Sequence, residues 1–116
     1  AVLSAVVFAQ DIPDINKIDD PIEQISVLIK KAKPYSRSNP DSARYHYQMG
    51  LKIAQKKSIP IQEARILRSI AKSYYLQRRY DTCLTITQRA LEISEKENDY
   101  KGLISAYIRK GYVAYY

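Results

Sequence analysis

Cysteine and histidine each occur once in this chain of 116 residues, as Cys83 and His46. A single cysteine cannot form an internal disulfide bond, and His46 has no cysteine or carboxylate at the spacing of metal ligands. Glycine is also scarce, with three residues, and the sequence contains no glycine-rich phosphate loop, HExxH motif or nucleophile elbow. We therefore expect no enzymatic activity, no metal and no cofactor, and we expect both residues to lie at surface or packing positions.

The composition is that of one soluble globular domain, because 46% of the residues are hydrophobic and 27% are charged. The five prolines lie at the edges of segments, and this placement, with the scarcity of glycine, favours helices. The formal net charge is +7, but the basic residues form no dense run. This charge indicates either an anionic partner or only a contribution to solubility.

The segment from Pro60 to Asn98 predicts two antiparallel helices, separated by a short break at Arg78 and Arg79. In each helix, the apolar and small residues recur at the spacing of one buried face. The first face consists of Ile66, Leu67, Ile70, Ala71 and Tyr74, and the second of Cys83, Leu84, Thr87, Ala90, Leu91 and Ser94. Small residues in the middle of both faces predict that the two helices approach closely.

These positions resemble the tetratricopeptide repeat (TPR) family, in which each repeat is a pair of antiparallel helices. The residues that match its large, small and aromatic positions are Leu67, Ile70, Ala71, Tyr74, Tyr80, Cys83 and Ala90. Arg78, Thr87 and Glu95 stand where the family usually has a glycine, an aromatic residue and a proline. The resemblance implies an all-α fold, namely an α–α superhelix of helical hairpins, of which this chain is a fragment.

A shift of 40 residues aligns the chain with itself, as expected for a repeat array. The aligned pairs include Asp41 with Asp81, Gln48 with Gln88, Leu51 with Leu91, Lys56 with Lys96 and Ala71 with Gly111. We predict a degenerate repeat at 21–59, a repeat at 60–98 and a partial repeat at 99–116. The tetrad from Asp99 to Gly102 resembles the start of a long-period TPR variant. Because helical repeats cannot bury their faces alone, we expect the natural protein to continue beyond both ends.

Residues 1–10 are apolar and uncharged, and a polar segment follows at once. They predict the remnant of a secretory signal peptide, cleaved after Ala9 or Gln10, and thus an exported, periplasmic protein. An apolar segment packed on the first repeat, or a stub of membrane helix, is the alternative. Residues 11–20 predict an acidic linker, and Asp20 with Pro21 predicts the start of the first helix.

In the TPR family, the concave groove is lined by the first helix of each repeat. The resemblance implies a peptide-binding groove formed by Arg65, Arg68, Lys72, Tyr75, Ser105, Ile108, Tyr112 and Tyr115. Such a groove suits an extended peptide that carries an acidic group or a C-terminal carboxylate beside an aromatic or aliphatic anchor. The alternative is that Arg65, Arg68 and Lys72 form an ordinary solvated face, and that most tyrosines pack between repeats.

The sequence therefore predicts a non-catalytic protein- or peptide-interaction module. Export together with long-period repeats resembles the periplasmic half of regulators in Bacteroidetes-like bacteria, which implies the sensory or scaffold part of a larger signalling protein. A free-standing periplasmic or cytoplasmic TPR adaptor or assembly scaffold is the alternative. We expect no nucleic-acid partner, and a membrane contact only through a segment outside this chain.

Overall fold

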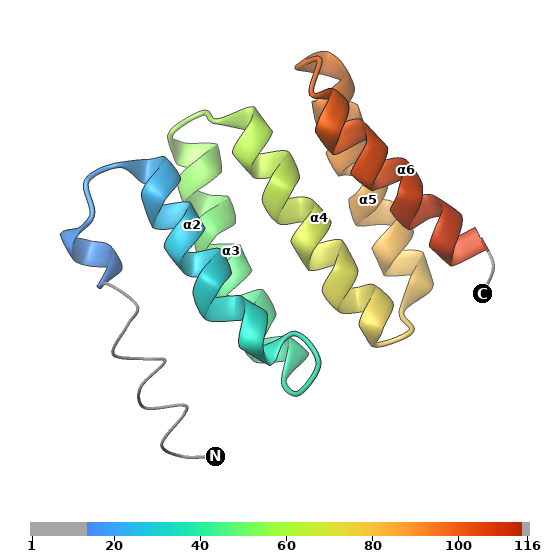
Figure 1. Ribbon diagram of the computed structural model, residues 1–116, viewed down its shortest axis with the longest axis horizontal. Coiled ribbons are helices and arrows are strands. Elements are labelled where there is room, and N and C mark those ends of the chain that lie inside the picture. The colour runs from blue at the N-terminus through green and yellow to red at the C-terminus, as the bar shows by residue number, and fades with distance from the viewer. Residues whose placement is uncertain (1–13, 115–116) are drawn as a thin grey trace.

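The computed structural model describes residues 14–114, which form helices and no strand (Figure 1). A short 3-10 turn, η1 (Ile15–Lys17), precedes five α-helices. A second 3-10 turn, η2 (Lys33–Tyr35), follows the first α-helix. The α-helices are α2 (Pro21–Ala32), α3 (Pro40–Lys56), α4 (Pro60–Leu76), α5 (Tyr80–Lys96) and α6 (Tyr100–Ala114). The all-α expectation is confirmed, whereas the proposed signal remnant at residues 1–10 lies outside the described residues.

Capping residues and prolines set the starts of the first two long helices. The side chain of Asp20 accepts a hydrogen bond from the backbone N–H of Ile22, and that of Asn39 accepts one from Ser42. A proline follows each of these caps at the first helical position. Its missing N–H is no loss there, because an N–H at this position has no partner within the helix. The segment predicted as a linker is partly ordered, since Ile18 is buried and its carbonyl accepts a hydrogen bond from Gln24.

The same left-handed turn ends α3, α4 and α5. Ser58, Arg78 and Asn98 adopt φ angles of 54°, 60° and 55°, the only positive φ angles among non-glycine residues in the described chain. At each turn, the next backbone N–H reaches back to a carbonyl five residues earlier, as in the pair of Arg79 N and Tyr74 O at 2.9 Å. The turns are 20 residues apart, so each half of the 40-residue period is one helix followed by one turn.

Replacing Arg78 by glycine is expected to stabilise the fold by about 0.5–1 kcal/mol, because a side chain at positive φ is strained and glycine is not. Asn98→Gly should change stability less, because asparagine tolerates this conformation better than arginine. Urea unfolding of both variants would measure the difference. A destabilised Arg78→Gly variant would show that the contacts of the arginine side chain outweigh its backbone strain.

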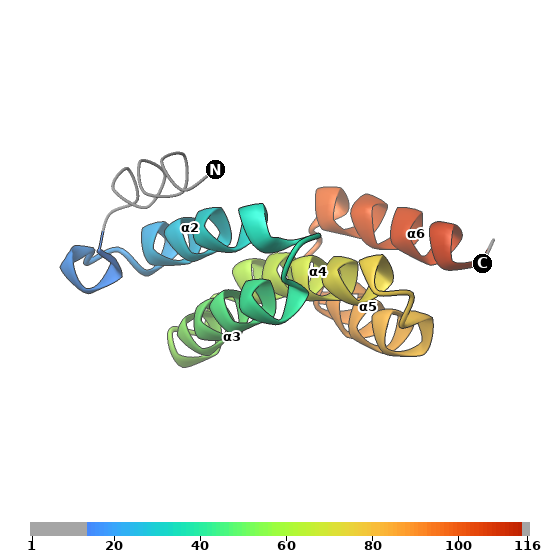
Figure 2. The ribbon, with the colours of Figure 1, turned by 90° about the horizontal axis from the view of Figure 1, so that it is seen from below.

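The helices form two layers. Figure 2 shows α2, α4 and α6 on one side and α3 and α5 on the other, with α4 set deeper than α2 and α6. Consecutive helices pack against each other, and α4 also contacts α2 and α6 within its own layer. This arrangement places α4 between α2 and α6 within its layer.

A main core fills the space between α2, α3 and α4 and extends to α5. Its buried residues include Ile25, Ile29, Tyr47, Leu51, Ile66, Leu67, Ile70 and Ala90. A smaller cluster joins α4, α5 and α6 through Ala71, Cys83 and Val113, all nearly inaccessible to solvent. Ala71, Cys83 and Ala90 therefore occupy the close crossings predicted for small residues.

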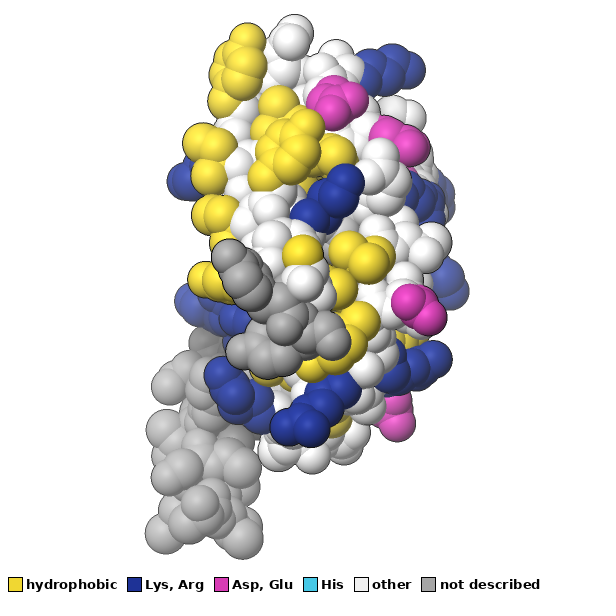
Figure 3. Space-filling model, turned by 90° about the vertical axis from the view of Figure 1, so that its right-hand side faces the viewer, with side chains coloured by type: hydrophobic (Ala, Val, Ile, Leu, Met, Phe, Trp, Pro, Cys, Tyr) yellow, Lys and Arg dark blue, Asp and Glu magenta, His cyan; other side chains and the backbone are white. Residues whose placement is uncertain are grey.

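The outer face of α6 is apolar and exposed. Tyr100, Ile104 and Tyr107 are 71%, 62% and 55% exposed, and exposed Gly111 continues the same stripe. Figure 3 shows hydrophobic side chains gathered on the end of the molecule that carries α5 and α6. Within residues 14–114, no helix combines the length and the apolar character required to cross a membrane.

Candidate functional site

A first pocket of about 240 Å³ lies where α4, α5 and α6 meet. Its lining residues are Arg65, Arg68, Ser69, Lys72, Thr87, Ser105 and Arg109. Helical spacing explains why α4 supplies four of them, since positions 65, 68, 69 and 72 follow one face of the helix. The pocket therefore combines four cationic side chains with three hydroxyl groups.

A second pocket of about 390 Å³ lies between α4 and the segment that follows α2. Its lining residues are Lys33, Pro34, Ser36, Arg37, Tyr47, Ser69, Lys72, Ser73 and Leu76. Ser69 and Lys72 line both pockets, so the two cavities adjoin across α4. We call the two pockets together the basic groove.

The basic groove carries charge of one sign. Its six cationic side chains are Lys33, Arg37, Arg65, Arg68, Lys72 and Arg109, and none of the described residues that line it is an aspartate or a glutamate. Three separate parts of the chain supply these cations, so the excess positive charge gathers on folding although the sequence contains no basic run. A groove lined by one sign of charge with low-dielectric walls attracts ligands of the opposite sign.

Arg68 is a largely buried cation of the groove, with its side chain 22% exposed. Its Nη1 atom lies 3.8 Å from Asp99 Oδ2 and, within the described chain, is buried without a hydrogen bond. Burial lowers the pKa of Arg68, the nearby Asp99 carboxylate opposes this shift, and Arg65 adds to it. Because removal from water disfavours the charged guanidinium, a second anion close to Arg68 would stabilise it.

Gly102 makes room for Arg68 and Asp99. A Cβ atom at this position would lie 2.2 Å from Asp99 Oδ2, 2.6 Å from Arg68 Nη1 and 2.7 Å from Ser94 Oγ. The backbone N–H of Gly102 donates to Asp99 Oδ1 at 3.1 Å, which caps the start of α6. The Asp99–Gly102 tetrad therefore joins the end of α5 to α6 and holds the guanidinium of Arg68 between them.

Gly102→Ala is expected to lower the free energy of unfolding by about 1 kcal/mol, because displacing the Asp99 cap outweighs the better helix propensity of alanine. Gly111→Ala is the matched control in the same helix. A Cβ atom at Gly111 would meet nothing within 4 Å, so this variant should gain up to about 1 kcal/mol. Thermal and urea unfolding would measure both changes, and equal signs would contradict the prediction.

Arg109 connects the first pocket to a cluster of tyrosines. Its guanidinium carbon lies 4.8 Å from the ring centroid of Tyr75 and 5.7 Å from that of Tyr112. The rings of Tyr75 and Tyr112 are 6.3 Å apart, and Tyr75 also contacts Tyr80 at 5.7 Å. Cation–π contacts of this kind hold an arginine beside an aromatic surface. The basic groove is therefore bordered by tyrosine rings on the side of α6.

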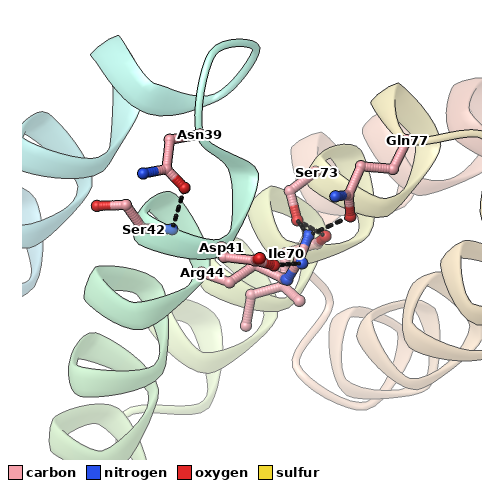
Figure 4. A network of polar contacts seen from close by, with 7 residues as sticks. All are labelled: Asn39, Asp41, Ser42, Arg44, Ile70, Ser73 and Gln77. Atoms are coloured by element: carbon pink, nitrogen blue, oxygen red, sulfur yellow. Dashed lines mark hydrogen bonds and ion pairs between the residues drawn. The ribbon is translucent and has the colours of Figure 1, made fainter.

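A polar network fixes α3 against α4 below the second pocket (Figure 4). Arg44, which is 9% exposed, donates to Gln77 Oε1 at 2.7 Å and to Ser73 Oγ at 3.3 Å, and it pairs with Asp41. Ser73 in turn donates to the carbonyl of Ile70 at 2.7 Å. Both hydrogen-bonding roles of the Ser73 hydroxyl are thus used within the protein, so this residue shapes the pocket rather than offering it a donor.

The structure brings together part of the groove that the sequence predicted. Arg65, Arg68, Lys72 and Ser105 all line the first pocket. Tyr75 and Tyr112 meet through Arg109, Ile108 is 49% exposed on α6, and Tyr115 lies outside the described residues.

Three cations of the basic groove are not among the groove residues predicted from the sequence, namely Lys33, Arg37 and Arg109. Lys33 lies in the 3-10 turn η2 and Arg37 in the turn that follows it, where an α-helical period does not indicate which side chains face the groove. Arg109 directly follows a predicted groove residue, and its basic character was the signal that could have found it.

The single cysteine and the single histidine lie at packing or surface positions. Cys83 is fully buried, which raises the pKa of its thiol and keeps it in the neutral, unreactive form. His46 stacks on Tyr35 with ring centroids 6.5 Å apart, and its Nδ1 lies 2.9 Å from the carbonyl of Ser42. Within residues 14–114, no three His, Cys, Asp or Glu side chains gather as a metal site would require.

Comparison with known proteins gives no relative, since no protein-family model, curated protein or solved structure matches the chain.

Proposed function

We propose that this chain is a non-catalytic interaction module that binds an extended acidic peptide in the basic groove. The observation that carries the proposal is the positive charge of the two adjoining pockets. Six cationic side chains line them, and no carboxylate is among the described lining residues. Arginine binds carboxylates through paired hydrogen bonds, so Arg65, Arg68 and Arg109 suit the side chains of Asp and Glu or a free C-terminal carboxylate.

The proposed architecture is a TPR-like superhelix. Its support is the 20-residue spacing of the helix–turn units and the alternation of helices between two layers. Small residues at the crossings of α4 and α5 add to this support. In such an array, the layer of α2, α4 and α6 would be the concave side, which is where the two pockets lie.

An acidic peptide with matched controls tests the binding proposal. The probe is an acetylated decapeptide with four glutamates, and the controls replace every glutamate by glutamine or leave the C-terminal carboxylate free. We expect the acidic peptide to shift the backbone amide NMR signals of Arg65, Ser69 and Lys72, with an affinity that falls as salt rises. Equal binding of the glutamine peptide, or shifts confined to other helices, would overturn the proposal.

The cellular setting that we propose is the periplasm, where the module would form the sensory or scaffold part of a larger signalling protein. The support is the apolar segment at residues 1–10 and the resemblance to exported regulators. A free-standing TPR adaptor is the second candidate. Alkaline phosphatase fused after residue 20 of the natural gene tests export, because the enzyme is active only after translocation, and an inactive fusion would contradict it.

A further inference from the structure

Lys72 is the one predicted groove residue among the described residues that line the second pocket, and this pocket has two further cations of its own. Lys33 and Arg37 line it from the segment between α2 and α3, and neither belongs to the first pocket. Both residues are exposed, so their charged groups are accessible to an anion that enters the pocket from solvent. The pocket also carries the hydroxyl group of Ser36, which can donate to a carboxylate.

The positions of the lining residues on α4 give the offset of the two pockets. The first pocket uses positions 65–72 of this helix and the second uses positions 69–76. At about 1.5 Å of rise per residue, their centres are about 6 Å apart along the helix axis. Ser69 and Lys72 line both pockets, so the pockets share one face of α4. From this face the first extends toward α6 and the second toward the segment that follows α2, so the axial offset of about 6 Å is the smallest separation of their centres.

We propose that the basic groove binds a peptide with two acidic clusters, one in each pocket, and that Lys33 and Arg37 form the second subsite. This inference rests on the proposed function, because it assigns a second contact to the same peptide. Extended chain advances about 3.4 Å per residue, so a separation of at least about 6 Å corresponds to two or more residues. Lys72 lies between the clusters, and the chain of the peptide crosses α4 near Ser69.

The occupant is a peptide rather than a nucleic acid because of what lines the two cavities. Bases of single-stranded nucleic acids stack on exposed aromatic rings. Tyr47 is the one aromatic residue among the described lining residues, and it is 4% exposed. The rings of Tyr75 and Tyr112, which border the first pocket, contact each other and have the Arg109 guanidinium over them. The guanidinium groups that line the pockets can bind the carboxylates of a peptide, and the serine hydroxyls can donate to a carboxylate or to a backbone carbonyl.

Two capped peptides test the second subsite. The first carries two Glu-Glu pairs separated by a spacer of three residues, each of them serine or glycine. The second has two glutamines in place of one Glu-Glu pair. The Lys33→Ala, Arg37→Ala double variant should weaken binding of the first peptide about 10-fold and leave the second unchanged. The Lys30→Ala, Lys31→Ala variant is the matched control, because it removes the same charge from the same helix end without touching a lining residue.

The outcomes separate the two proposals. If the Lys33, Arg37 variant binds both peptides like the parent while Arg65→Gln, Arg68→Gln loses both, the second subsite is wrong and the first pocket stands. If neither peptide shifts amide signals around the first pocket, the proposed function itself fails. Tighter binding of a ten-nucleotide poly-dT strand than of the first peptide would overturn the choice of a peptide ligand.

Discussion

Replacing Ile66 by alanine is expected to lower the free energy of unfolding by about 2–5 kcal/mol, one of the two largest effects that we predict. Ile66 is fully buried in the main core, where its Cδ1 atom packs onto the backbone of Gly50 in α3. Truncation would leave a cavity at the α3–α4 contact. In a domain of about 100 residues, a loss of 3 kcal/mol lowers Tm by more than about 10 °C.

Ile61→Ala is the control for this prediction, because it makes the same chemical change in the first turn of the same helix. Ile61 is 47% exposed, and its truncation should alter stability by no more than about 0.5 kcal/mol. Thermal unfolding followed by circular dichroism at 222 nm would measure both variants. Similar losses for Ile66→Ala and Ile61→Ala would mean that α4 is not packed as the structure describes.

The helices could be predicted from the sequence because each is marked by local signals that neighbouring elements do not override. Proline after a capping residue fixed the starts at Pro21 and Pro40, and apolar residues at helical spacing fixed the buried face of α4. The turns were harder to recognise. Ser58 and Arg78 are residue types that rarely adopt a left-handed conformation, so theirs follows from the helices on either side, whereas asparagine at position 98 tolerates it.

The basic groove could be predicted only in part, for a physical reason. The face of α4 with Arg65, Arg68 and Lys72 follows from one helical period within one segment. The remaining cations line the basic groove from elements that pack next to α4 but lie about 30–40 residues away in sequence. Their approach depends on how α2 and α6 flank α4, and periodicity within a helix does not contain that information.

The burial of polar groups could not be predicted from the sequence either. Arg44 lies on the face of α3 toward α4, a position that a hydrophobic pattern would assign to solvent or to an apolar residue. It is satisfied there by Asp41, Ser73 and Gln77, and its guanidinium carbon lies 4.3 Å from the ring centroid of Tyr74. A buried cation with this set of partners favours one register of α3 on α4 and thereby fixes the shape of the second pocket.

Lys72→Glu is expected to weaken binding of the acidic decapeptide by about 10- to 100-fold, the second of the two largest effects. Lys72 lines both pockets, so the new carboxylate would repel an acidic ligand in either one. Its side chain is exposed, and the substitution should leave the fold intact. Each factor of 10 in the dissociation constant corresponds to about 1.4 kcal/mol, a magnitude that one reversed charge in a partly desolvated groove can supply.

Lys52→Glu separates this local effect from the change in total charge. Lys52 is also exposed, but it lies on α3 in the other layer and lines neither pocket. Reversing its charge alters the net charge by the same amount as Lys72→Glu. It should weaken binding no more than about 3-fold at 0.15 M salt, where the Debye length of about 8 Å screens distant charges. Fluorescence anisotropy with the labelled peptide would measure both variants. If both substitutions weaken binding equally, only the net charge attracts the peptide, and the groove on α4 is not the binding site.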